Sequence, residues 1–128
     1  MKYYFGKTLS GSFDDAVART TEALKAEGFG IITEIDVRKT LQEKIGVVVR
    51  NYRILGACNP KLAFEALELE DKIGTMLPCN VVVQEREGHQ IEVAAIDPVA
   101  SMQAVDNPKL IEAAQQVSDS LKRVIDGL

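Results

Sequence analysis

Four stretches of the chain space their apolar residues three or four positions apart, the pattern of a helix with one buried face. Asn is a preferred N-cap and Pro is favoured at the first helical position, so Asn59-Pro60 and Asn107-Pro108 each open a helix. Ser12 and Asp36 are caps of the same kind for two earlier helices. The pattern predicts helices over 12–28, 36–46, 59–74 and 107–125, and a short helical piece around 100–105.

Shorter stretches rich in β-branched residues alternate with these helices and predict strands. They cover 2–9, 30–36, 47–55, 79–87 and 90–96, and the last two flank a turn at Gly88-His89 as a hairpin. The order β-α-β-α-β-α-β-β-α contains one strand–helix–strand crossover and a terminal hairpin. We therefore predict an α+β fold, with residues 1–128 as a single domain that packs helices on a mixed, largely antiparallel sheet of about five strands.

Size and composition agree with one globular domain. The chain has 128 residues, of which 46% are hydrophobic and 27% charged, enough to bury a core without disulfides or metals. No stretch of 18 apolar residues occurs, so we predict no membrane partner, and the N-terminal MKYYFGKTLSG lacks the apolar run of a signal peptide. We expect a cytoplasmic protein whose cysteines are reduced thiols.

Charge and motif content exclude several classes of function. The net charge is −4, basic residues are scattered, and aromatic residues make up 5% with no Trp, so we predict no nucleic acid partner. The chain has a single histidine, His89, and no CxxC, HxH or HExxH motif. It has no phosphate-binding loop either. We predict no metal and no cofactor.

The only two cysteines, Cys58 and Cys79, lie in the similar stretches GACNP (56–60) and LPCNV (77–81). Helix initiation accounts for Asn59-Pro60, because Asn107-Pro108 does the same with no cysteine nearby. Cys58 lies one residue before the cap, where the positive end of a helix dipole stabilises a thiolate. For both cysteines the alternative is a small, buried, unreactive side chain.

The sequence leaves open how far apart the two cysteines lie. If strands three and four were parallel neighbours, a strand length would separate them; if the loops bend back, both line one pocket. Arg50, Tyr52 and Arg53 interrupt the apolar strand just before GACNP, and alternation places Arg53 on the face opposite the other two. An arginine beside a thiol and a helix N-terminus would favour a small anionic ligand. The alternative is a solvent-facing strand surface.

Four segments make the chain resemble the DUF302 family, small bacterial and archaeal proteins of unknown function. The segments are GFGIITEIDV (28–37), YRILGACNPKLAFEAL (52–67), LPCNVVV (77–83) and IDP (96–98). The resemblance implies an α+β fold and a homodimer. It also implies that a set of residues belongs to the family signature: Tyr52, Arg53, Cys58, Asn59, Pro60, Pro78, Cys79 and Asn80.

Three hypotheses for function follow from these residues. The first is a dimeric domain that binds or senses a small ligand in a pocket near the cysteines; its residues would be Arg50, Tyr52, Arg53, Cys58, Asn59, Cys79 and Asn80. The second is thiol-dependent redox or sulfur-transfer chemistry, with Cys58 as the nucleophile and Cys79 as the resolving thiol. In the third, the signature residues are purely structural and hold a dimer interface.

Overall fold

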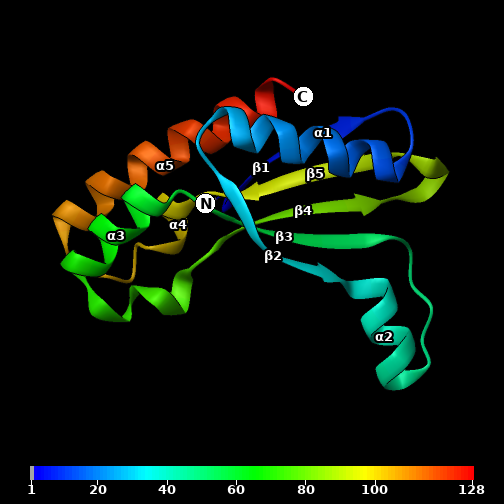
Figure 1. Ribbon diagram of the computed structural model, residues 1–128, viewed down its shortest axis with the longest axis horizontal. Coiled ribbons are helices and arrows are strands. Elements are labelled where there is room, and N and C mark those ends of the chain that lie inside the picture. Colours follow the sequence, from blue (N-terminus) through cyan, green and yellow to red (C-terminus); the bar gives the residue numbers. More distant parts are fainter. Residues whose placement is uncertain (1) are drawn as a thin grey trace.

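Five strands form one sheet in the order β1-β5-β4-β3-β2 (Figure 1). Their bounds are Tyr4–Leu9, Gly30–Asp36, Tyr52–Cys58, Cys79–Glu85 and Ile91–Ile96 for β1 to β5. The computed structural model describes residues 2–128, and all four strand pairings within them are antiparallel. The predicted α+β class and five-stranded sheet are confirmed.

The one crossover in the fold connects β1 and β2, which run parallel at the two edges of the sheet, through the helix over 13–26. No crossover connects β3 and β4. The segment between β3 and β4 consists of the helix α3 (Pro60–Leu69) and the 3₁₀ helix η1 (Asp71–Met76). These two elements lie beyond the end of the sheet instead of crossing its face, so the chain re-enters the sheet at the end it left (Figure 1). Strands β3 and β4 are therefore adjacent and antiparallel.

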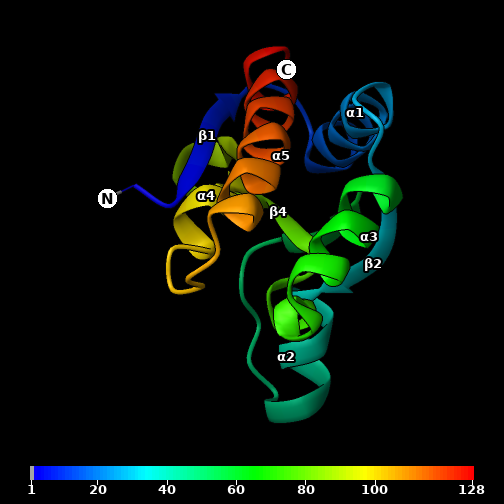
Figure 2. The same ribbon diagram turned by 90° about the vertical axis from the view of Figure 1, so that its left-hand side faces the viewer.

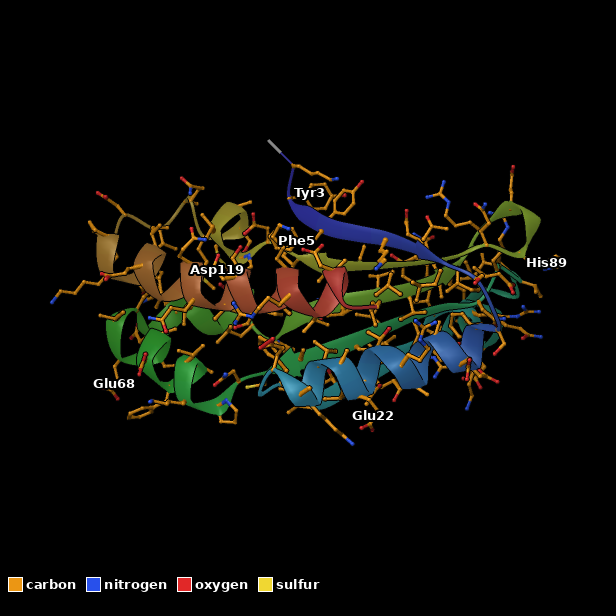
Figure 3. The ribbon with its side chains drawn as sticks, turned by 90° about the horizontal axis from the view of Figure 1, so that it is seen from above. Tyr3, Phe5, Glu22, Glu68, His89 and Asp119 are labelled. Carbon is orange, nitrogen blue, oxygen red and sulfur yellow. The ribbon has the colours of Figure 1, made fainter. Side chains whose placement is uncertain are left out.

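Helices cover one face of the sheet in two rows. The long helix α5 (Pro108–Asp126) forms one row, and α1 (Phe13–Ala26) and α3 follow each other along the second (Figure 3). The short helix α4 (Pro98–Ser101) packs beside α5. Each predicted cap is present: the side chains of Ser12, Asp36, Asn59 and Asn107 accept hydrogen bonds from backbone N–H groups of the helices they begin.

The buried apolar residues form two clusters. The larger one lies between the sheet and the helices α1 and α5 and includes Leu24, Phe29, Leu55, Val81 and Leu121. The smaller one joins α3, η1, α5 and the segment after α4, and consists of Ala66, Ile73, Met102, Leu110 and Ala114. The end of the sheet that carries both cysteines lies where the two clusters meet.

The opposite face of the sheet is open. Tyr52, Ile54, Val82, Ala94 and Ile96 alternate with the core residues of their strands and are only half-buried. Helix α2 (Val37–Ile45) projects at one edge of this face and has no buried residue, and in the described residues no helix lies over the middle of the face (Figure 2). An antiparallel sheet with one packed face and one open face is a common arrangement.

The strand predicted over 47–55 and the helix predicted over 59–74 have different bounds in the structure. The β-branched run at 47–49 was expected to belong to a strand over 47–55, but it is not paired to a neighbouring strand, and β3 begins only at Tyr52, opposite Gln84. The helix predicted over 59–74 breaks at Glu70, whose backbone is extended. The Glu70 carboxylate accepts a hydrogen bond from Lys72 N–H and starts η1 there. The first difference arises because strand pairing depends on residues distant in the sequence, and the second because a local hydrogen bond overrides the apolar pattern.

Gly56 permits a close approach at the end of β3. A Cβ atom at this position would lie 2.0 Å from Thr33 Oγ1 and 2.8 Å from Pro78 Cγ, both of which are far inside van der Waals contact. Thr33 lies in β2, next to a β-bulge, and Pro78 immediately precedes Cys79. Glycine at position 56 thus lets β2 and the start of β4 close on β3 from both sides.

Replacing Gly56 with alanine is expected to destabilise the fold by about 1–3 kcal/mol, the usual range for overpacking a buried site. The matched control is Gly30→Ala in β2, where an added Cβ meets no atom within 4 Å. Denaturant unfolding of both variants measures the difference. Equal stability of the two variants would contradict the close approach at Gly56.

Candidate functional site

A cavity of about 300 Å³ lies at the end of the sheet, under α3 and α5. It is bounded by the last residues of β3, the first residues of β4, Phe29 before β2 and Pro98 after β5. Its wall is almost entirely apolar; the exceptions are Cys58, Asn59 and Cys79. The volume falls at the lower end of the range for small-molecule pockets, which is about 300–1,000 Å³.

Both cysteines line this cavity and neither is oxidised to a disulfide. The antiparallel register pairs Ala57 with Cys79, so Cys58 lies one residue from the position opposite Cys79. The separation by a strand length, which the sequence left open, does not occur. Cys58 is half-buried, whereas Cys79 is buried with 7% of its surface exposed.

The two thiols have different electrostatic surroundings. Burial, and secondarily the nearby Cys58, raise the pKa of Cys79 from 9.0 to about 11. A thiol in an apolar wall keeps its proton because the charged thiolate loses its hydration there. At neutral pH, Cys79 is therefore a poor source of thiolate for the resolving role assigned to it in the redox hypothesis.

Exposed apolar side chains surround the cavity opening. Ile32 and Leu67 line the cavity and are nevertheless 61% and 43% exposed, so they lie where the cavity meets solvent. Phe64 lies one helical turn before Leu67 on α3 and is 63% exposed. Ile32 in β2 and Leu67 in α3 form an apolar rim at the opening, and Phe64 is a further exposed apolar side chain on α3.

Arg53 does not line the cavity. It lies near the start of β3, five positions before Cys58, which is about 17 Å along an extended strand. Its guanidinium lies 2.7 Å from Glu34 and 3.8 Å from Asp36, and 5.5 Å from the centre of the Phe13 ring. Two carboxylates thus neutralise the charge that was predicted to favour an anion beside the thiols.

The other residues predicted to bind a ligand also lie outside the cavity. Tyr52 and Asn80 line a shallow hollow on the open face of the sheet, on the side away from the helices. Arg50 precedes β3 in the loop after α2 and lies 3.5 Å from Glu87. The structure therefore brings together Cys58, Asn59 and Cys79, and it separates them from Arg50, Tyr52, Arg53 and Asn80. The assignment of these residues to ligand binding stays a prediction.

The pattern analysis missed the helical wall of the cavity. Small residues on two helices leave the space empty, and four of them are Ala63 and Ala66 on α3 with Ala113 and Ala114 on α5. Met102 and Leu110 complete this side. In the sequence, only these alanines indicate the cavity. They can be interpreted once α3 and α5 are known to face each other.

Residues 2–128 contain no group of three or more His, Cys, Asp or Glu side chains placed to hold a metal ion. None of the helices described is long and apolar enough to cross a membrane.

These features define a class of protein: an α+β domain with a half-covered antiparallel sheet and an apolar, thiol-lined cavity at the sheet end. The chain belongs to the family described as Domain of unknown function DUF302, whose model matches residues 5–128. It is similar to the crystal structure of uncharacterized conserved protein DUF302 from Bacillus stearothermophilus, with 28% identity, a TM-score of 0.91 and 98% of each chain covered. No curated protein matches the chain.

The raised pKa of Cys79 predicts a specific pH dependence of stability. Below pH 9 the thiol is protonated in both the folded and the unfolded chain and contributes no difference. Between pH 9.0 and about 11 the unfolded thiol ionises and the folded one does not, so the free energy of unfolding falls as pH rises, by about 2 kcal/mol in all.

The test compares the wild-type chain with Cys79→Ala in denaturant unfolding at about pH 8 and about pH 11. Tyrosine and lysine titrate in both proteins, so their effect cancels in the difference. The wild type is expected to lose about 2 kcal/mol more than the variant over this range. Equal losses would show that Cys79 ionises as freely in the folded chain as in the unfolded one.

Proposed function

We propose that the chain binds a small apolar molecule in the cavity between α3, α5 and the end of the sheet. The observation that supports this is a cavity of about 300 Å³ with an almost wholly apolar wall and an apolar rim open to solvent. Other hollows on the surface of the molecule are as large or larger, and this one differs from them in its almost wholly apolar wall. Concave, mostly apolar cavities with a few polar groups are the usual form of small-molecule sites.

The composition of the wall favours an apolar ligand over the small anion expected from the sequence. No lysine or arginine lines the cavity among the described residues, and Arg53 is engaged by Glu34 and Asp36. A charged group placed in such a wall would lose its hydration with nothing to replace it. The polar end of a bound molecule therefore belongs at the opening, near Cys58 and Asn59.

A series of straight-chain alcohols from butanol to octanol tests the proposal by calorimetric titration. Each added methylene is expected to gain about 0.8 kcal/mol of burial, a roughly fourfold tighter dissociation constant, with a negative heat-capacity change. Affinity that does not change with chain length would contradict an apolar site.

A cavity-filling variant locates the site. Ala63 lines the cavity on α3, and Ala63→Leu is expected to weaken octanol binding about tenfold or more, since the added carbons occupy the space of roughly two methylenes. Ala26→Leu, an exposed position at the end of α1, is the matched control and should bind as the wild type does. Equal affinity of the two variants would place the alcohols elsewhere.

The alternatives to ligand binding receive partial support. The raised pKa of Cys79 argues against its role as a resolving thiol, so thiol-dependent redox chemistry is the weaker candidate. A structural role is supported for part of the signature: Asn59 caps α3, and Pro78 packs closely against Gly56. These structural roles leave the cavity and Cys58 unexplained.

We also propose that two copies of the chain associate through the open face of the sheet. This face presents half-buried apolar side chains on β3, β4 and β5, while α2 and the loop after it expose Ile45, Val47 and Val48 without burying any residue of the helix. A nine-residue helix gains little stability on its own and relies on packing. A two-fold axis would place each of these surfaces against its counterpart in a second copy.

Sedimentation velocity tests this association. The wild type is expected to sediment as a particle of twice 14.0 kDa, and Val82→Lys, in the middle of the open face, as a folded monomer. A buried lysine facing its own symmetry mate loses hydration and meets a like charge. The control Gln116→Lys, on the exposed side of α5, should remain dimeric. A monomeric wild type, or a dimeric Val82→Lys, would contradict the proposal.

A further inference from the structure

We propose that Cys58 accepts an acyl group from an acyl thioester of coenzyme A, with the apolar acyl chain held in the cavity, an inference that rests on the proposed apolar-ligand site. The product is a thioester on Cys58 whose hydrocarbon tail fills the space between α3 and α5. The cavity thus becomes a modification site for acyl chains of medium length.

The position of Cys58 fits this chemistry. It is the half-buried cysteine among the residues that line the cavity, and it lies at the junction of β3 and α3. Asn59 caps α3 directly after it, and the partial positive charge at the start of that ten-residue helix favours a negatively charged group nearby. The oxyanion of the tetrahedral intermediate is such a group.

The acyl transfer balances without any further reactant. The Cys58 thiolate attacks the carbonyl carbon of the thioester and forms a new S–C bond. The bond between that carbon and the sulfur of coenzyme A breaks, and the departing thiolate takes up the proton that Cys58 released. One thioester is exchanged for another, and nothing is oxidised or reduced.

The size of the cavity determines which part of the acyl donor can be buried. A space of about 300 Å³ has room for about ten atoms at roughly 30 Å³ each, which suits a medium acyl chain and excludes the much larger coenzyme A group. The apolar rim of Ile32 and Leu67 lies where the chain would enter. The leaving group therefore stays in solvent, next to the opening, while the chain is buried.

The reactivity of Cys58 can be compared with that of Cys79 in the same molecule. Cys79 also lines the cavity, but it lies deeper, is 7% exposed and keeps its proton at neutral pH because burial raises its pKa to about 11. The same acyl donor should therefore distinguish two thiols that share one cavity. Reaction at both cysteines would indicate general thiol reactivity. If Cys58 alone reacts, the dependence of the rate on acyl chain length shows whether the cavity directs the transfer.

The experiment incubates the purified full-length chain with octanoyl coenzyme A at neutral pH and measures the intact mass over time. The wild type and Cys79→Ser are expected to gain one octanoyl group, which hydroxylamine removes, and Cys58→Ser to gain none. Acetyl coenzyme A should react at least about tenfold more slowly, because its chain is too short to bury. Ala63→Leu should slow octanoyl transfer about tenfold without slowing acetyl transfer.

The outcomes separate this inference from the binding proposal. If the wild type binds octanol but gains no octanoyl group, or gains it on both cysteines at the rate of the urea-unfolded chain, acylation of Cys58 is wrong and the apolar site stands. If octanol does not bind and no adduct forms, both proposals fail. Cys58→Ser should still bind octanol reversibly, and this shows that the variant keeps its folded cavity.

Discussion

The antiparallel pairing of β3 with β4 is the constraint on which the rest of the molecule depends. The register that pairs Ala57 with Cys79 makes the chain leave and re-enter the sheet at the same end. Everything between these residues, including α3 and η1, must then pack beyond that end instead of across the helical face. This arrangement leaves room for α1 and α5 on the sheet and creates a second apolar cluster beside the first. The cavity lies at their junction.

Part of the family signature is explained by packing at this junction. Gly28 has a φ of +87°, and an added Cβ there would come within 3.3 Å of the Asn59 side chain, which itself caps α3. Gly56 lets Thr33 and Pro78 approach β3. The segments around residues 28, 56, 59 and 78 are therefore mutually dependent, since each limits the side chain that its neighbour can carry. Such contacts require no ligand, and they isolate Cys58 and the cavity as the features that packing does not explain.

The sequence predicted local structure well and tertiary relations poorly. Caps at Ser12, Asp36, Asn59 and Asn107 were identified because capping depends on a few adjacent residues. The start of β3 was predicted too early because the β-branched run at 47–49 has strand propensity but no partner strand. Strand pairing is set by contacts between residues distant in the sequence. Alternation correctly placed Tyr52 and Arg53 on opposite faces.

The candidate site was only half predictable for the same reason. The two cysteines were identified from their spacing and context, and the structure brings them to one cavity. Arg53 was assigned to the same site because it is near Cys58 in the sequence. In an extended strand, however, the five positions from Arg53 to Cys58 span about 17 Å. The cavity itself depends on alanines of α3 and α5 meeting across a helix interface, a coincidence that no local pattern of residues records.

The central claim is that the space between α3, α5 and the sheet end is an apolar site that takes up apolar molecules. A crystal of the protein equilibrated with xenon gas tests it most directly, because xenon enters dry apolar cavities and scatters strongly. The account predicts a xenon atom within the cavity, in contact with side chains such as Leu62, Met102 and Leu110. A cavity closed by repacked side chains, or occupied by hydrogen-bonded water with no xenon, would contradict it.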